Sequence, residues 1–309
     1  MNSAIDTQSR KAGKGRGYKP LMLWSWHEVS PVRRWALVWP REHGAWGILL
    51  VSLITGAAVG LLSAANLVPL LWLTLAAIAT FCLRTPIENS MPKSHLRPRT
   101  QAEWRWARTA ASGYILIGAF AGAMLWLDGA VRLIWMPAVA AFGLFALQAV
   151  VKRFGRAWRL TAEILAAFGM TLAAAVGYIV AAGKTGDLAV GLWLLNGLFA
   201  ANQILYVQFR ISEARDARNS SSLQRKRIFL ASEAVTVLAI LAGAWTGWSP
   251  ELALVAFLPL LLRGAIWSFR RGQTPLRIHR LGKTELAQAI VFGLILIAVY
   301  RIPWEQVLR

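Results

Sequence analysis

Long runs of apolar residues recur along the chain, and this recurrence constrains the fold more than any other feature. A helix that crosses a bilayer needs about 20 mostly apolar residues. Only 16% of the 309 residues are charged and the mean hydropathy is +0.48, whereas about a quarter of the residues in a soluble domain are charged. The sequence therefore predicts an all-α, polytopic transmembrane helical bundle of about nine spans. These lie at 44–63, 66–83, 107–127, 131–150, 160–182, 187–209, 228–247, 250–269 and 285–301.

Basic residues are distributed unequally between the two ends of the predicted spans. Almost all of the 34 Lys and Arg fall in the N-terminal tail or at one set of span ends. The exceptions are Arg132, Lys184, Arg301 and Arg309. Because Lys and Arg accumulate on the cytosolic side of membrane proteins, we expect a cytosolic N-terminus and a C-terminus outside. Orientation accounts for the net charge of +20, so we expect anionic lipid and the bilayer, and no nucleic acid, as partners.

The chain divides into a basic cytosolic tail, 1–38, and a single nine-helix transmembrane domain, 39–309. The tail ends in a Trp-rich stretch, which predicts an interfacial segment because tryptophan favours the headgroup level. Prolines such as Pro86 are expected at or beyond the span ends, where a missing N–H costs little. Glycines spaced four apart predict close helix packing within one compact bundle. The pairs are Gly56 and Gly60, Gly118 and Gly122, and Gly243 and Gly247.

A first group of candidate site residues lies at the predicted cytosolic ends of the first two spans. It consists of Arg41, Glu42 and His43 before the first span, and Arg84, Glu88 and Asn89 after the second. Two interpretations remain open. A carboxylate at a helix start is stabilised by about 0.3–1 kcal/mol, which explains Glu42 without a function. Ionisable groups at membrane depth are nevertheless functional by default.

A second group of candidates lies on the fifth and sixth predicted spans and in the segment that follows the sixth. It consists of Glu163, Asn202, Tyr206, Arg210, Glu213 and Asp216. Most of those on the sixth span share one helical face, which we expect to line a cavity or a helix interface. We expect Arg84 to pair with Glu88 and Arg159 to pair with Glu163, since each pair is four residues apart. Around Glu213, neighbouring arginines favour ion pairing over cation binding.

No sequence pattern predicts a confident metal site. His43, His95 and His279 are far apart and lack the spacing of zinc-binding histidines. The one cysteine, Cys82, excludes a disulfide framework and a Cys-based zinc site. The catalytic residues, if there are any, are therefore not identified by motif.

Three segments together resemble a known family of bacterial integral membrane proteins. They are WPREHGAWGILLVSLITG at the first span, FCLRTPIE at the end of the second and ILYVQFRISEAR at the end of the sixth. They are similar to the YwiC-like family, and the resemblance covers most of the chain from about residue 39 onward. It implies a multi-pass protein of the bacterial cytoplasmic (inner) membrane and no particular reaction.

The layout of spans and loops more loosely resembles the UbiA-type intramembrane prenyltransferases. That superfamily holds Mg²⁺ and a prenyl diphosphate on Asp-rich motifs after spans two and six, which correspond here to Arg84 to Asn89 and to Arg210 to Asp216. The chain offers few carboxylates there and several arginines, which can grip a phosphate directly. The resemblance implies an anionic or isoprenoid lipid bound in a cytosol-facing cavity that His43 would join, and Mg²⁺ only if the standard chemistry is retained.

Three functions therefore remain open at this point. The first is binding of a lipid or prenyl-phosphate ligand, with a divergent UbiA-like transferase as its enzymatic form. The second is a small-molecule or lipid transporter, which would need polar residues near the bilayer midplane; Asn196 is the best candidate. The third is a non-catalytic scaffold of a membrane complex.

Overall fold

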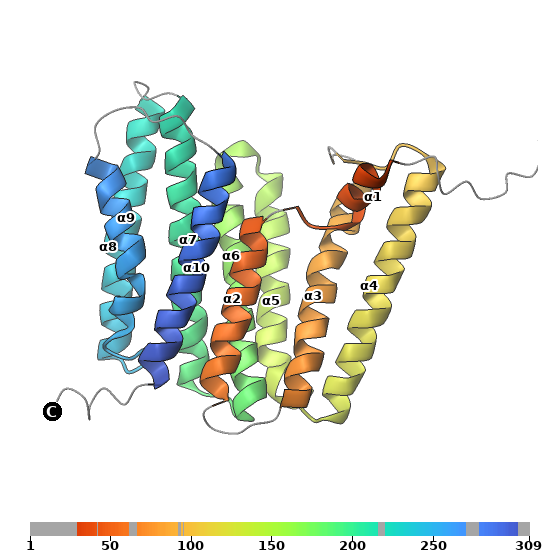
Figure 1. Ribbon diagram of the computed structural model, residues 1–309, viewed down its shortest axis with the longest axis horizontal. Helices are drawn as coiled ribbons and strands as arrows, with labels where there is room; N and C mark the ends of the chain where they lie inside the picture. Colours follow the sequence, from red (N-terminus) through yellow and green to blue (C-terminus); the bar gives the residue numbers. More distant parts are fainter. Residues whose placement is uncertain are drawn as a thin grey trace, which may run out of the picture.

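The computed structural model describes residues 30–41, 43–61, 67–91, 94, 96–215, 220–269 and 278–301. Over these residues every regular element is a helix, which confirms the all-α class (Figure 1). The α-helices are α1 (Pro31–Val38), α2 (His43–Gly60), α3 (Leu67–Ser90), α4 (Gln101–Leu127), α5 (Val131–Arg153), α6 (Arg159–Ala182), α7 (Asp187–Arg215), α8 (Ser220–Trp245), α9 (Ala253–Phe269) and α10 (Ile278–Arg301), with a 3-10 turn, η2 (Arg156–Trp158), before α6.

Helices α2 to α10 coincide with the nine predicted apolar runs. Seven of them, α3 to α8 and α10, are long and apolar enough to cross a membrane. The other two are shorter apolar helices, Gly44–Gly60 within α2 and Ala253–Phe269, which is α9. The helices therefore support a multi-pass membrane protein. The number of true spans and their orientation stay predictions.

The charged span ends are helical where loops were expected. Helix α3 continues to Ser90 and α4 begins at Gln101, so more than half of 84–106, the interval between the second and third predicted spans, is helical. In the same way α7 ends only at Arg215 and α8 begins at Ser220. Hydropathy marks where a helix leaves the apolar region and not where it ends, and charged pairs along a helix stabilise its polar continuation.

Pro86 is a second correction, because it lies inside α3 and not beyond its end. A proline inside a helix removes one backbone hydrogen bond and usually kinks or breaks the helix. Here the next turn remains helical, and the Ser90 hydroxyl donates a hydrogen bond of 2.7 Å to the Pro86 carbonyl oxygen. The expectation that proline marks the helix end was wrong at this position.

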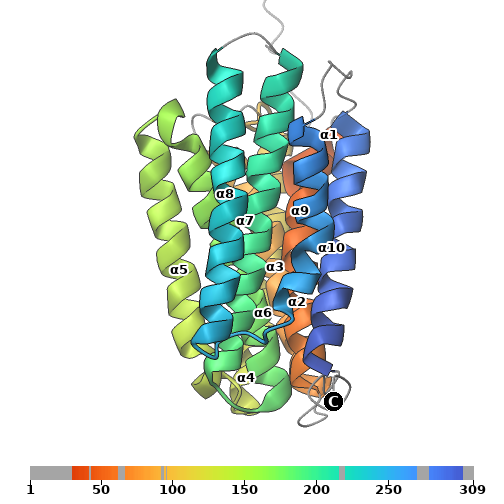
Figure 2. The same ribbon diagram turned by 90° about the vertical axis from the view of Figure 1, so that its left-hand side faces the viewer.

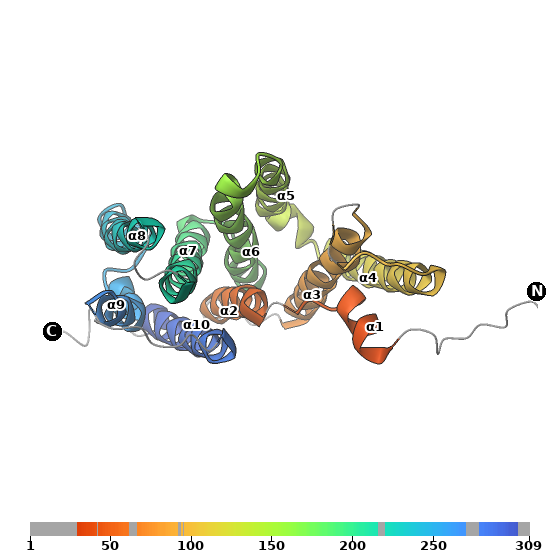
Figure 3. The same cartoon turned by 90° about the horizontal axis from the view of Figure 1, so that it is seen from above.

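Helix α6 lies at the centre of the molecule, between α2, α5 and α7 (Figure 3). Within its apolar window 72% of the residues are buried, against 11% in α4. Helices α7 to α10 run side by side, with α8 packed on α7 and α9 (Figure 2). Helix α3 packs mainly against α4, and the short α1 rests on both. The apolar outer faces of α4 and α5, with Phe142 76% exposed, are suited to contact lipid.

The closest helix contact joins α2 and α6 through glycine. A Cβ added at Gly56 would overlap the Ala174 carbonyl oxygen, and one at Gly60 would lie 2.7 Å from the Tyr178 carbonyl oxygen. A Cβ at Gly177 would lie 2.7 Å from the Leu53 carbonyl oxygen in turn. Small residues on both helices thus let the two backbones approach, as the first GxxxG pair predicts.

The other two GxxxG pairs have different roles. A Cβ at Gly118 would make only ordinary contact with Ala79, and one at Gly122 would meet no atom within 4 Å. Gly243 faces the Ser249 side chain, and Gly247 has a φ of +79° in the turn after α8. A left-handed backbone of this kind favours glycine for conformational reasons. Only the first pair therefore marks a close helix–helix contact.

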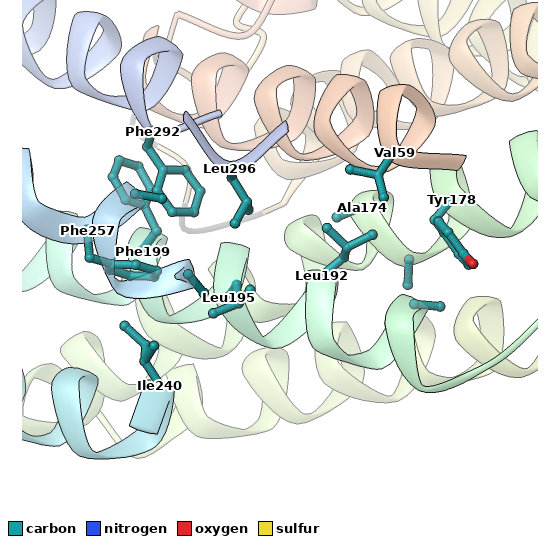
Figure 4. Close-up of a cluster of buried hydrophobic side chains, with 14 of the residues drawn as sticks. Val59, Ala174, Tyr178, Leu192, Leu195, Phe199, Ile240, Phe257, Phe292 and Leu296 are labelled. Carbon is teal, nitrogen blue, oxygen red and sulfur yellow. The ribbon is translucent and has the colours of Figure 1, made fainter. Parts of the chain in front are cut away.

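The main apolar core lies where α7, α9 and α10 meet. The rings of Phe199 and Phe292 stack with centroids 4.0 Å apart, and Phe257 meets Phe292 edge-on at 5.1 Å (Figure 4). Leu192 and Leu296 are fully buried in the same cluster. Aromatic packing of this kind adds about 0.5–1.5 kcal/mol per pair beyond area burial. These ring contacts pack α7, α9 and α10 against one another.

Candidate functional site

A pocket opens between α1 and the end of α3, and several predicted site residues line it. Its empty volume is about 550 Å³, part of which is open to solvent. We call it the α1–α3 pocket, and its lining residues are Ala36, Trp39, Pro40, Arg41, Phe81, Arg84, Thr85, Glu88, Asn89 and Leu96. It therefore combines an aromatic wall with basic and amide groups at one end of the bundle.

Side chains of α3 and α4 hold α1 in place by binding its backbone carbonyls. Asn89 donates to the Leu37 oxygen at 3.2 Å, and the Trp106 indole donates to the Arg34 oxygen at 3.1 Å. The Tyr114 hydroxyl donates to the Val38 oxygen at 3.4 Å. The last carbonyls of a helix have no partner within it. The neighbouring helices thus cap α1 and fix the wall of the pocket.

An ion pair fixes the other end of α1. The Arg33 guanidinium donates to both carboxylate oxygens of Glu103 on α4, through Nε and Nη2. This bond to a carboxylate raises the pKa of the Arg33 guanidinium. Thr100 caps the start of α4 by accepting from the Glu103 N–H at 3.2 Å. Charge-assisted, bidentate bonds of this type are among the strongest in proteins.

Positive charge exceeds negative charge around the α1–α3 pocket. Arg84 donates to Glu88 at 2.9 Å, which confirms the predicted pair, and Lys152 of α5 lies 3.7 Å from the same carboxylate. Arg41 is exposed and donates through Nη2 to the Val32 carbonyl oxygen at 3.1 Å. Two cations, Arg84 and Lys152, thus lie at the Glu88 carboxylate, and Arg41 adds a third positive charge to the pocket lining. Such a pocket is electrostatically suited to an anion.

The segment before the first span is partly described. Trp39 stacks on Trp46 with centroids 5.3 Å apart, and Trp46 donates to the Pro40 carbonyl oxygen at 3.2 Å. These contacts anchor the start of α2 against the pocket. Glu42 lies outside the described residues, and His43 begins α2 with a side chain that is not described. The participation of both in a site stays a prediction.

A second group of predicted residues belongs to a buried polar cluster between α7, α8, α9 and α10. We call it the interior polar cluster, and its members are Gln203, Tyr206, Arg210, Glu213, Glu233, Arg263, Trp267, Glu285 and Gln288. Arg210 pairs with Glu213 and stacks its guanidinium 3.6 Å from the Trp267 ring centroid. The predicted internal pairing of Glu213 with an arginine is thus confirmed.

Arg263 and Glu285 form the centre of the interior polar cluster. They make an ion pair with side chains 12% and 8% exposed. The Arg263 guanidinium also lies 3.8 Å from the Tyr206 ring centroid, and Gln203 donates to the Glu285 carbonyl oxygen at 2.8 Å. The polar face predicted on the sixth span, which is α7, therefore packs against α9 and α10.

Sequence reasoning missed Arg263 as a site residue. It was expected on the cytosolic edge, whereas α9 continues to Phe269 and encloses it. The sequence does contain a feature that identifies it: Arg263 lies inside the predicted apolar run 250–269, and an arginine there needs a partner in the bundle. Glu233 and Glu285 lie near the starts of the predicted spans 228–247 and 285–301, so the sequence leaves them open to the same two interpretations as Glu42.

The remaining predicted residues that the structure describes belong to neither of the two sites. Glu163 accepts from Arg159 at 2.8 Å, as predicted, and from Gln208 of α7 at 3.1 Å. Asn202 is 1% exposed, and neither polar atom of its side chain has a partner in the described part of the chain. Asn196 is also buried and donates to the Leu192 carbonyl oxygen at 2.8 Å. Asp216 lies outside the described residues.

The two loop motifs expected to share one cavity lie in separate clusters. Helices α2 and α6 lie between α3, which bears Glu88, and α7, which bears Glu213 (Figure 3). No residue of α7 lines the α1–α3 pocket. Among the described residues, no three His, Cys, Asp or Glu side chains come together as metal ligands. The described carboxylates thus show no shared metal shell.

Comparison with known proteins gives one match. Residues 39–178 match the family model described as YwiC-like protein. The matched part includes Arg41, Arg84, Glu88 and Asn89 of the α1–α3 pocket, and it ends before the interior polar cluster. No curated protein and no solved structure is significantly similar to the chain.

Proposed function

We propose that the chain is a YwiC-like multi-pass protein of the bacterial inner membrane that binds the phosphate headgroup of a lipid in the α1–α3 pocket. The observation that carries the proposal is the excess of positive charge at this pocket: Arg41 and Arg84 line it together with one carboxylate, Glu88, and Lys152 lies 3.7 Å from that carboxylate. Arginine binds phosphate through paired N–H groups and suits a doubly charged headgroup.

The walls of the pocket suit a lipid better than a soluble anion. Trp39 and Phe81 line it beside the two arginines, and the tryptophan ring favours the headgroup level of a bilayer. Helix α1 is amphipathic, with Leu37 and Val38 buried and Trp35 61% exposed. A helix of this kind is suited to lie in the membrane surface. The pocket would then open at the depth of the headgroups.

Binding is favoured over prenyl transfer of the UbiA type. Transfer in that superfamily needs carboxylates that hold Mg²⁺, and Mg²⁺ requires a set of oxygen ligands. Glu88 is instead bound to Arg84 and lies near Lys152. The pocket thus presents cations to an anion, and Mg²⁺ would enter only with a diphosphate ligand that brings its own oxygens.

The orientation of the bundle is the first prediction to test. The ends of α3 and α5 and the starts of α4, α6 and α8 lie at the same end of the molecule as α1 (Figure 1), and these ends carry most of the basic residues. With nine spans and a cytosolic N-terminus, a reporter enzyme that works only in the cytosol is expected to be silent when fused at the C-terminus. The same reporter after Arg156 should be active. The reverse pattern would contradict the proposed orientation.

Replacing the two pocket arginines is expected to weaken lipid binding. In native mass spectrometry of the full chain, the R41A/R84A variant should bind added phosphatidic acid at least about tenfold more weakly than the wild type, because each charge-assisted bond contributes about 1.5–3 kcal/mol. Undecaprenyl phosphate is the isoprenoid arm of the same experiment, and diacylglycerol is the uncharged arm. Preference for either phosphate lipid identifies the class of ligand.

The matched control is Arg159→Ala, which breaks the Arg159–Glu163 pair. This pair has the same four-residue spacing as Arg84–Glu88 and lies at the same end of the bundle, but it does not line the pocket. It should leave lipid binding unchanged. Equal binding of phosphatidic acid and diacylglycerol by the wild type would contradict the proposed function. So would equal loss of binding in the control and in R41A/R84A.

A further inference from the structure

The interior polar cluster has one more carboxylate than it has cations. Arg210 pairs with Glu213, and Arg263 pairs with Glu285. Glu233 of α8 remains, and the ion pair that the structure gives to Arg263 is with Glu285. Burying a carboxylate without a partner costs far more than burying its neutral form.

The carboxyl group of Glu233 is held against the backbone of α9. Its Oε1 is buried and has no hydrogen-bond partner among the described residues. A Cβ at Gly264 would overlap this same oxygen, so the glycine makes the room that the carboxyl occupies. Arg263 is the residue before Gly264 on α9, and its guanidinium is close enough to act electrostatically on the Glu233 carboxyl. A carboxyl and a guanidinium are thus neighbours without being paired.

Further unpartnered polar atoms surround this position. The Nε and Nη2 of Arg263, the Oε2 of Glu285 and the Oε1 of Gln288 are buried without partners in the described part of the chain. The Nε and Nη2 groups of Arg263 can therefore donate hydrogen bonds to a second carboxylate. Buried donors and acceptors that remain open in this way need a ligand or a rearrangement to satisfy them.

We infer that Glu233 is a proton-binding site inside the bundle and that Arg263 is its exchangeable counter-ion. When Glu233 holds a proton, Arg263 pairs with Glu285, which is the arrangement of the structure. When Glu233 releases the proton, its carboxylate takes the free Nε and Nη2 of Arg263. The charges facing Glu233 from the adjoining helices are Arg263 on α9, with Glu285 behind it on α10 and the Arg210–Glu213 pair on α7.

The location of Glu233 suits exchange with the cytosol if the proposed orientation holds. Glu233 lies about one and a half helical turns inside the predicted span that begins at residue 228. Arg263 and Glu285 also lie near the ends of their predicted spans on the same side, so the whole group is close to the predicted cytosolic surface. Membrane transporters use intramembrane carboxyl groups of this kind as proton relays. The inference supports the transporter alternative and does not depend on lipid binding in the α1–α3 pocket.

Infrared difference spectroscopy of the full chain in lipid nanodiscs tests the inference. A protonated carboxyl group has a C=O band that shifts in D₂O, and the wild type at neutral pH should show one such band. E233Q should lose it. E285Q should also lose it, because Arg263 then pairs with an ionised Glu233. R263Q should show about twice the wild-type band, since both carboxyls lose their cation and protonate.

The control is E163Q, which removes a carboxylate paired with an exposed arginine at another helix start. It should keep the wild-type band unchanged. A wild type without the band overturns the inference, and this result needs no variant to fold. An E233Q protein that keeps the band also overturns it. An E285Q protein that keeps the band overturns the role of Arg263 as an exchangeable counter-ion.

Discussion

Replacing Gly56 by alanine is expected to destabilise the protein by about 3 kcal/mol or more. The added methyl group would overlap the Ala174 carbonyl oxygen, which is backbone and cannot turn aside as a flexible side chain would. Helix α2 must therefore move away from α6, the most buried helix of the bundle. The measurement is the unfolding midpoint in detergent, followed by the fluorescence of the 16 tryptophans.

The matched control for this substitution is Gly122→Ala. Gly122 belongs to a GxxxG pair as well, but a Cβ there would meet no atom within 4 Å. Alanine is favoured over glycine in a helix interior by up to about 1 kcal/mol, so G122A should be neutral or slightly stabilising. A similar loss of stability in both variants would contradict the assignment of the α2–α6 contact to Gly56.

Replacing Arg263 by methionine is expected to cost about 3–5 kcal/mol of stability, because it removes one partner of the buried Arg263–Glu285 ion pair. The double variant R263M/E285L should regain most of this loss. A well-packed apolar pair of similar volume is often as stable as a buried ion pair. The measurement is the same unfolding midpoint, taken for R263M, for E285L and for the double variant.

The comparison between the single variants adds a second test. In E285L, Arg263 can pair with Glu233 instead, so this variant should lose less stability than R263M. An equal loss in the two single variants would indicate that Glu233 cannot replace Glu285. A double variant as unstable as the sum of the single variants would contradict a direct pair between Arg263 and Glu285.

The sequence predicted the class and positions of the helices well, because hydropathy records which residues face apolar surroundings. It predicted the helix ends poorly. Arg84 and Glu88 read as the start of a loop, but they pair within α3, and Pro86 lies inside the same helix. A polar helical turn and a polar loop have similar composition, so hydropathy does not separate them.

The sequence predicted ion pairs between residues close in the chain, but it did not predict which distant segments come together at the candidate sites. Pairs close in sequence, such as Arg159 with Glu163, follow from helical spacing. Contacts between distant segments, such as Asn89 with Leu37 or Arg263 with Glu285, have no local signal. The same is true of Gly56, whose role could be separated from that of Gly122 only once the neighbouring helices were in place.

The lipid retained by the purified protein is the most direct test of the proposed function. Lipid extracted from the wild type and identified by mass spectrometry should contain a phosphate-bearing species at about one molecule per chain, as tight binding predicts. The R41A/R84A variant, purified with an unchanged unfolding midpoint, should retain little of it. A wild type that retains no phosphate-bearing lipid, or a variant that retains as much as the wild type, would contradict headgroup binding in the α1–α3 pocket.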